Sequence, residues 1–345
     1  MPVDPASVPD FDDLPKVKDM PQGCAWGIFD HSGKKDLVGT LNFLTPDIVK
    51  AAAAEVQDGV SVSLNWPLNA LSQLGLPGRN PTKHNVLYLP ESMPDGVPPH
   101  AASWDDELSF NTQNSSQWDS LCHVQHLPSG LAYNGFKPTK ENLAVESTAA
   151  NTQPTLDHWH EHGGIAARGV LLDYKRYAEE KGISFHAWGG DRLTVKQLEA
   201  CAQHFGVEFR YGDVLIVRTG ATDILANPTP EDLEAMEAHR MSGIHGSVEA
   251  ARWIWNKRFA AVASDALALE AFPPIKPDGT EGGLGDLVLH HYLLSLFGMS
   301  IGELWDLSRL SEYCARKKRY SFMLTSIPLN HPCLIGSPPN ALAIL

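Results

Sequence analysis

The chain has 345 residues, of which 43% are hydrophobic and 20% are charged, as in ordinary globular proteins. Its formal net charge of −14 argues against nucleic acid or an anionic membrane surface as a partner, because both would repel it. No apolar run approaches the roughly 20 residues that cross a bilayer.

The N-terminus and the cysteines both indicate a cytoplasmic location. The first residues are acidic and rich in proline, unlike a targeting peptide. The five cysteines are scattered and form no CxxC pair, which argues against a cysteine zinc site. We therefore expect a reduced, cytoplasmic protein.

The first third of the chain predicts little regular structure. Prolines at 2, 5, 9, 15 and 21 predict an extended N-terminal arm over residues 1–30. Thr45-Pro46 predicts the start of a helix, because threonine is a good N-cap and proline fits the first turn. Residues 60–64 alternate as a strand does. Residues 68–103 are rich in Pro, Gly and Asn and predict a long irregular excursion, a lid or an interface arm.

The second half alternates between apolar strands and amphipathic helices. Strands are predicted at 169–173, 213–217, 260–264 and 320–325, and helices after Thr194, over 230–240, over 248–256 and over 304–316. This alternation predicts one mixed α/β domain over residues 31–345.

One short polar stretch carries most of the recognisable chemistry. It reads Gln113-Asn-Ser-Ser-Gln117-Trp-Asp119-Ser-Leu-Cys122-His123 and combines amides, a carboxylate, a thiol and an imidazole. Burying such groups is costly unless they satisfy one another, a metal or a substrate, so the stretch predicts one wall of an active site. The aromatic residues Trp104, Phe110 and Trp118 are candidates for lining it and binding substrate.

Several blocks, including this stretch, resemble in order the cyclase family of metal-dependent hydrolases, which contains kynurenine formamidase and isatin hydrolase. The matching blocks are residues 39–46, 113–123, 168–173, 212–220, 261–265, 289–290, 328–330 and 336–340. The resemblance implies a swivelling β/β/α single domain with a central mixed, barrel-like sheet. It also implies a homodimer or homotetramer that acts on a small molecule.

The family signature is His-x-Gly-Thr-His-x-Asp-x-Pro-x-His, and this chain departs from it at both metal-binding histidines. The two positions are Gln113 and Gln117 here, whereas Asp119 is retained and His123 resembles the catalytic base. An amide oxygen is a weak, neutral ligand compared with imidazole. The two glutamines therefore either complete an oxygen-rich metal site or bind the substrate.

The resemblance places the remaining metal ligands late in the chain. Glu303 fits the family's glutamate, and His290 or His291 fits its histidine, with His290 favoured by the residues that follow it. The implied cofactor is a divalent metal (Zn, Mn or Mg), although the glutamines leave open a site without metal.

Three other motifs are less consistent with catalysis. Cys122 would face away from His123 on a strand, which disfavours a thiol nucleophile. No Gly-x-Ser-x-Gly elbow surrounds the serines, which disfavours a serine hydrolase. The alternating histidines 158, 160 and 162 could form a metal trap, but a surface loop is the favoured interpretation.

Three functions remain compatible with these residues. The favoured one is a cyclase-family hydrolase that cleaves an amide or lactam C–N bond, or a lactone, in a small cyclic or aromatic substrate, with His123 as general base. The glutamines motivate a second, a metal-free lyase, isomerase or cyclase acting on a small aromatic or polyketide-like substrate. The third is a catalytically inactive binding protein of the same fold.

Overall fold

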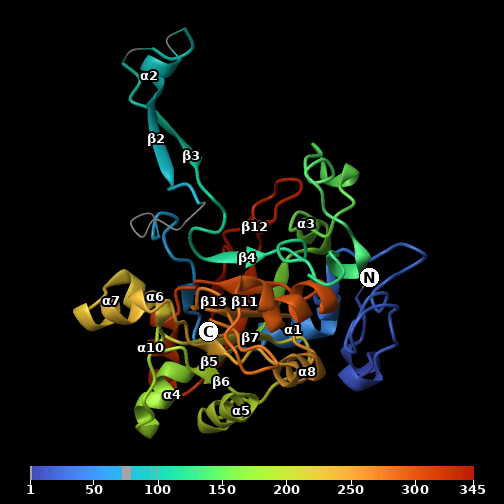
Figure 1. The fold of residues 1–345 in the computed structure, drawn as a ribbon. Helices are drawn as coiled ribbons and strands as arrows, with labels where there is room; N and C mark the ends of the chain where they lie inside the picture. The colour runs from blue at the N-terminus through green and yellow to red at the C-terminus, as the bar shows by residue number, and fades with distance from the viewer. Residues whose placement is uncertain (1, 72–78, 94, 99) are drawn as a thin grey trace.

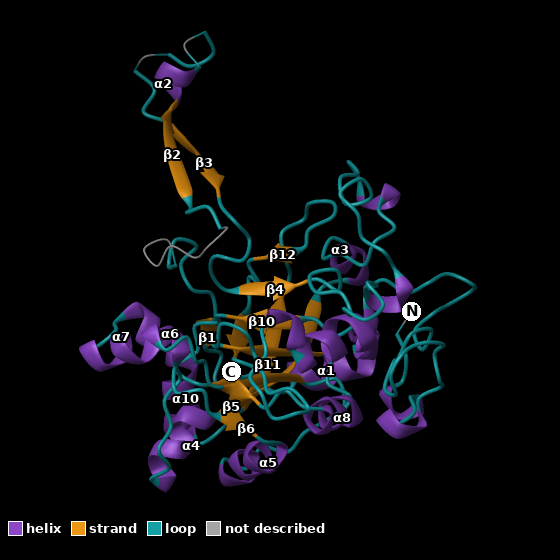
Figure 2. Ribbon diagram, in the orientation of Figure 1, coloured by secondary structure: helices purple, strands orange, loops and turns teal. Residues whose placement is uncertain are grey.

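A nine-stranded mixed sheet forms the centre of the protein (Figures 1 and 2). The computed structural model describes residues 2–71, 79–93, 95–98 and 100–345. The strand order is β1-β13-β11-β5-β7-β9-β10-β4-β12. Its strands are β1 (Ser61–Ser63), β4 (Gln117–Asp119), β5 (Ile165–Asp173), β7 (Val214–Arg218), β9 (Ala261–Ser264), β10 (Ile301–Glu303), β11 (Ser321–Ser326), β12 (Gly336–Ser337) and β13 (Leu342–Ile344).

Four neighbouring strands of this sheet are parallel, and each outer strand pairs antiparallel with its neighbours. β5, β7, β9 and β10 run in one direction, so their carboxyl ends meet at one edge of the sheet. The sheet is mixed and curled into a half-barrel, which confirms the predicted α/β fold class. In open α/β sheets, ligands bind beyond the carboxyl ends of the parallel strands.

Helices flank the sheet and close two hydrophobic cores, one on each of its faces. They are α1 (Pro46–Ala53), α3 (His158–His162), α4 (Tyr174–Lys181), α5 (Val195–His204), α6 (Ala221–Ala226), α7 (Pro230–Glu237), α8 (Val248–Asn256), α9 (Val288–His290) and α10 (Ser308–Lys317), and α9 continues into a π-helix (His291–Phe297). Along β5, Val170 and Leu172 belong to one core and Leu171 to the other, as the two-residue period of a strand requires. Each fully buried side chain of this kind contributes roughly 1.5–3 kcal/mol.

Local signals in the sequence placed several helix starts correctly. The Thr45 hydroxyl accepts the backbone N–H of Ile48 at the start of α1, and Thr194 with Gln197 forms a reciprocal capping box at the start of α5. Such caps satisfy backbone N–H groups that have no partner within the helix. No described helix is both long enough and apolar enough to cross a membrane.

Two predicted elements differ from the structure. The helix expected from residue 304 begins at Ser308, because Glu303 ends β10 and Leu304 adopts a positive φ of 56°. The histidines from 158 to 162 form α3 rather than a loop, and His160 contacts the carbonyl oxygen of Pro328. Helical geometry does not place alternate residues on one face, so these histidines do not gather around a metal.

The N-terminal segment packs on the body of its own chain. Two short 3-10 turns, Pro5–Ser7 and Phe11–Asp13, interrupt its irregular path. Phe11 is 1% exposed within the larger core, and the indole of Trp255 donates to the carbonyl oxygen of Pro9. The segment therefore contributes to the stability of this chain.

A two-stranded hairpin stands away from the rest of the molecule in Figure 1. It pairs β2 (Lys83–Tyr88) with β3 (Trp104–Ser109) and carries the short helix α2 (Leu89–Ser92) near its end. The prediction of an irregular excursion over residues 68–103 is therefore wrong for these elements, and residues 72–78, 94 and 99 of that range lie outside the described part. A second small pair joins β6 (Arg192–Leu193) to β8 (Gly243–Ile244).

Candidate functional site

Two adjacent strands and the short helix α9 bring the predicted site residues together. In the antiparallel pairing of β10 with β4, Glu303 lies opposite Gln117. Because side chains alternate along a strand, Gln117 and Asp119 share one face of β4. His290 ends α9 and completes the group from the other side.

Asp119, His290 and Glu303 form a buried group of potential metal ligands. One ligand atom from each residue lies within 4.8 Å of the others. The three residues are 0%, 4% and 4% exposed. The predicted convergence of the polar stretch and the late histidine therefore occurs, across more than 160 residues of intervening sequence.

Both glutamines contact the carboxylates of this group. The side-chain N–H of Gln113 donates to Oδ1 of Asp119 at 2.6 Å, and that of Gln117 donates to Oε2 of Glu303 at 2.7 Å. A Cβ on Gly336 would lie 2.6 Å from the amide nitrogen of Gln113. A larger residue at position 336 would therefore displace the Gln113 side chain from Asp119.

Glu270 is a site residue that the sequence analysis missed. Its carboxylate accepts the backbone N–H groups of Val288, Leu289 and His290 at the start of α9, and it also contacts Nδ1 of His290 at 2.8 Å. Such a carboxylate fixes the orientation of an imidazole and leaves its other nitrogen for a ligand. Its only signal in the sequence is an acid within the apolar run 266–272.

The buried carboxylates control the protonation of the group. Burial alone would lower the pKa of His290, but its hydrogen bonds with Glu270 and Glu303 outweigh burial and raise the pKa to about 10. Burial and the charge of Asp119 raise the pKa of Glu303. His290, when it is protonated, supplies a positive charge to both Glu270 and Glu303.

Several oxygen atoms of the group are buried without a hydrogen-bond partner among the described residues. They are Oδ2 of Asp119 and the amide oxygens of Gln113 and Gln117. Leaving a buried carboxylate oxygen unpaired costs roughly 1–3 kcal/mol or more. Carboxylate and amide oxygens are ligands preferred by Mg²⁺, Ca²⁺ and Mn²⁺. The residues therefore fit a divalent cation that prefers oxygen.

The three remaining histidines of the region have different surroundings. His123 lies with Nε2 3.9 Å from Oδ1 of Asp119, and its side chain is 27% exposed, so it is accessible from solvent at the edge of the group. His291 instead lies beside the ring of His126, with 6.0 Å between ring centroids. His291 is not part of the group that Asp119, His290 and Glu303 form, because successive residues of a helix point in different directions.

The predicted aromatic lining is not supported. Trp118 faces the opposite side of β4 from Asp119, where its fully buried ring packs on Trp159 and Trp305. Trp104 is on the projecting hairpin and is 66% exposed. Phe110 lines a cavity of about 290 Å³ whose walls also include Trp66 and Ser116. The positions of these three aromatic side chains depend on strand register and on the path of the chain, and residue types do not encode either of them.

Cys122 has no features of a nucleophile. It is 5% exposed, and burial raises the pKa of its thiol well above the usual range. A thiol in such surroundings stays protonated and unreactive. The expectation that Cys122 is not a nucleophile is therefore supported by its burial, whereas its predicted place on a strand is wrong, since β4 ends at Asp119 and Cys122 lies in the following turn.

Comparison with known proteins relates this arrangement to one family. The model of the family described as Cyclase matches residues 44–271, more than half of the chain. A solved structure described as a novel cyclase superimposes with a TM-score of 0.74 at 29% identity, covering 93% of this chain and 97% of that one.

More distant solved structures share the fold. Isatin hydrolase A from Ralstonia solanacearum has a TM-score of 0.53 at 18% identity, covering 87% of this chain and 98% of its own. An isatin hydrolase bound to the product analogue thioisatinate has a TM-score of 0.52 at 14% identity, covering 86% of this chain and 95% of its own. No curated protein sequence matches the chain.

Proposed function

This chain belongs to the cyclase family, and on that premise we propose that it is a hydrolase of small cyclic or aromatic carbonyl compounds. The bond cleaved is an amide or lactam C–N bond, or the ester bond of a lactone. The related solved structures named as isatin hydrolases support a lactam as the first substrate to test.

A divalent cation would be held by Asp119, Glu303 and Nε2 of His290, with the amide oxygens of Gln113 and Gln117 as further ligands. The chemistry that such an ion supplies is polarisation of the substrate carbonyl and a lower pKa for a bound water. Glu270 would keep the proton of His290 on Nδ1 and so leave Nε2 free.

The observation that carries this proposal is the buried, unpaired Oδ2 of Asp119. Besides Asp119, the group contains the carboxylates of Glu303 and, bound to His290, of Glu270, but only the one imidazole of His290. It therefore has an excess of negative charge unless a proton or a cation neutralises it. Compensation by a cation is favoured because the unpaired oxygens of both glutamines belong to the same group.

His123 is the general base in this proposal. Its imidazole takes a proton from the attacking water, and the oxygen of that water forms a bond to the carbonyl carbon. The C–N or C–O bond then breaks, and His123 returns the proton to the leaving nitrogen or oxygen. Its partial exposure at the edge of the group allows both water and substrate to reach it.

The decisive test combines turnover with substitution of this base. The turnover of isatin, aryl formamides and lactones by the wild-type enzyme is measured. Elemental analysis of the purified protein determines its metal content. We expect His123→Ala to lower kcat/KM roughly 10²- to 10⁴-fold. The matched control is His31→Ala, an exposed histidine elsewhere in the chain, which should leave turnover unchanged. Full activity in His123→Ala would exclude the proposed role.

One observation favours a second function, metal-free acid–base catalysis by a lyase, isomerase or cyclase. The amide N–H groups of Gln113 and Gln117 already donate to Asp119 and Glu303, so the group has internal hydrogen bonds without any ion. Here His123 would remove a proton from the substrate and the amides would stabilise the resulting oxyanion. Turnover that persists after chelation, in protein without a stoichiometric metal, would select this function.

A further inference from the structure

The proposed base lies on a loop that has few hydrogen bonds to the rest of the protein. This His123 loop, residues 120–126, follows the end of β4 and contains neither a helix nor a strand. Backbone hydrogen bonds from the N–H groups of Ser120 and His126 fix its two ends. The imidazole of His123 lies between these ends, so its position depends on what holds the middle of the loop.

One side chain holds the middle of this loop. The hydroxyl of Ser295 donates to the carbonyl oxygen of Val124, the residue after His123, at 2.6 Å. Among the described residues, this is the only hydrogen bond to a carbonyl oxygen of residues 121–125. Removing the hydroxyl would therefore free the part of the loop that carries the imidazole.

Ser295 is a polar residue within a buried, apolar segment. It belongs to the π-helix His291–Phe297, it is 0% exposed, and its neighbours from Leu293 to Phe297 are all buried and apolar. Burying a hydroxyl is costly unless the hydroxyl is hydrogen-bonded. The contact with Val124 satisfies this hydroxyl, and π-helical turns lie frequently at functional sites.

The same helix makes a second contact with the loop. The ring of His291 packs edge-on against that of His126, with 6.0 Å between the ring centroids. Residues four apart in a helix lie on nearly the same face, so His291 and Ser295 both face the loop. His290, which directly precedes this helix, belongs to the group of potential metal ligands. The helix therefore connects that group to the loop that carries the base.

The N-terminal segment holds this helix from another side. The indole of Trp26 donates to the carbonyl oxygen of Ser295 at 2.7 Å, and the backbone N–H of Ala25 donates to that of Leu296 at 2.9 Å. A functional group is placed most precisely when packed, hydrogen-bonded elements support it. Ser295 is thus a fixed point to which the loop is attached.

We propose that Ser295 is a positioning residue for the reaction. Through the carbonyl oxygen of Val124 it holds the His123 loop, so that the imidazole stays beside Asp119 and within reach of the attacking water. This inference rests on the proposed hydrolase function, in which His123 is the general base. It assigns Ser295 to the proton-transfer step and not to substrate binding.

The test compares two buried serines whose hydroxyl groups each donate to a backbone carbonyl. Ser295→Ala should lower kcat roughly 10- to 100-fold and leave KM within about twofold, because a small displacement of a catalytic group slows the chemical step. In the matched control, Ser242→Ala removes a hydroxyl that donates to the carbonyl oxygen of His186 at 2.6 Å, in a residue that is 1% exposed, and kcat should stay unchanged. Ser295→Cys, with a weak S–H donor, should lose less than Ser295→Ala. Urea denaturation verifies that each variant is folded.

A double substitution separates positioning from a general loss of structure. In the His123→Ala background, Ser295→Ala should lower the residual kcat by less than about twofold, because residues that act as one unit have non-additive effects. A further loss as large as that in the wild-type background would show that Ser295 does not act through His123, and would overturn the inference.

Hydrogen exchange tests the attachment of the loop without any turnover. Peptides that cover residues 120–126 should exchange at least about tenfold faster in Ser295→Ala than in wild type or Ser242→Ala, because the loop opens more often. Unchanged exchange, or full kcat in Ser295→Ala, overturns the inference and leaves the hydrolase proposal standing. Absence of turnover with every substrate of the panel defeats the proposed function and, with it, the assignment to proton transfer, while faster exchange would still support the attachment of the loop to Ser295.

Discussion

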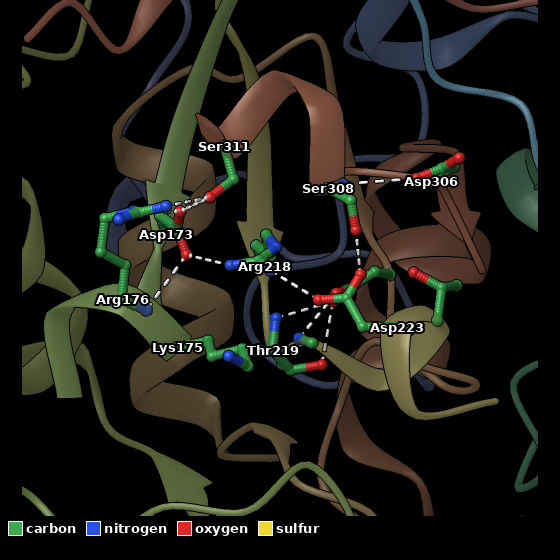
Figure 3. A network of polar contacts seen from close by, with 12 residues as sticks. Asp173, Lys175, Arg176, Arg218, Thr219, Asp223, Asp306, Ser308 and Ser311 are labelled. Atoms are coloured by element: carbon green, nitrogen blue, oxygen red, sulfur yellow. Dashed lines mark hydrogen bonds and ion pairs between the residues drawn. The ribbon is translucent and has the colours of Figure 1, made fainter. Parts of the chain in front are cut away.

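Two buried acidic clusters lie along the same edge of the sheet, and they differ in how their charges are compensated. One surrounds Arg218 at the ends of β5 and β7 (Figure 3). The other surrounds His290 near the end of β10. Both contain several carboxylates that are nearly inaccessible to solvent, so burial alone does not distinguish them.

The carboxylates of the cluster around Arg218 are compensated within the cluster, although Nε of Arg218 has no hydrogen-bond partner among the described residues. The guanidinium contacts Asp173 at 2.8 Å and Asp223 at 2.5 Å (Figure 3). Asp265 accepts the hydroxyl of Thr219 and two backbone N–H groups. Every carboxylate here faces a cation or several donors. Such a network stabilises the end of the sheet without needing a ligand.

The carboxylates of the cluster around His290 are not fully compensated in this way. Its one imidazole is shared between Glu270 and Glu303, and its remaining donors are neutral amides. Oδ2 of Asp119 has no partner in the described structure. The comparison teaches that unpaired carboxylate and amide oxygens, more than burial or charge, distinguish a candidate cation site from structural ion pairs.

The largest expected effect is on the cluster around Arg218. Arg218→Leu would leave the buried Asp173 with only the more distant Arg176 and the half-buried Asp223 without a cation, so we expect a loss of about 3–5 kcal/mol in the free energy of unfolding. Urea denaturation measures this loss. As a control, Arg240→Leu removes an exposed arginine paired with Glu281 and should cost at most about 1 kcal/mol. Equal effects of the two substitutions would contradict the comparison.

A divalent cation should stabilise only through the cluster around His290. Mn²⁺ at 100 times its Kd should raise the free energy of unfolding of wild type by about 2.7 kcal/mol. Asp119→Asn should abolish this increase, because it removes the unpaired charged oxygen. The exposed substitution Glu281→Gln should retain it. Stabilisation of the Asp119 variant by Mn²⁺ would place the cation elsewhere.

Glu270 should contribute both to folding and to the orientation of His290. Glu270→Gln keeps one acceptor oxygen but replaces the other by an NH₂ group, which faces the backbone N–H donors at the start of α9. We therefore expect a loss of about 1–3 kcal/mol in the free energy of unfolding. Metal affinity should fall roughly 10- to 100-fold, as for other residues that orient a ligand. Calorimetric metal titration checks this. Glu249→Gln, exposed on α8, is the matched control, and an identical metal affinity in both variants would refute the orienting role.

The smallest expected effect concerns the hairpin. Trp104→Ser should change the free energy of unfolding by no more than about 0.5 kcal/mol, because the side chain is 66% exposed. Trp118→Leu, at a fully buried position, provides the contrast and should be clearly destabilising. Urea denaturation of both variants distinguishes them. A large loss in Trp104→Ser would show that the hairpin is packed in solution.

The amino-acid sequence by itself determined the local elements and most of the candidate site. Apolar runs predicted β7 and β9, and threonine caps predicted the starts of α1 and α5, because these signals act between neighbouring residues. The match to the family signature also identified Asp119 and Glu303 as partners. Their approach within 4.8 Å is a tertiary fact that the structure supplies.

Only the tertiary structure decided which side chains face the site. Strand register turned Trp118 into the core, helix geometry separated His291 from His290, and the loop after β9 placed Glu270 at the start of α9. None of these follows from residue type, because the direction of a side chain depends on how distant segments pair. The sequence thus specified the chemical groups, and the packing of the sheet decided which of them meet.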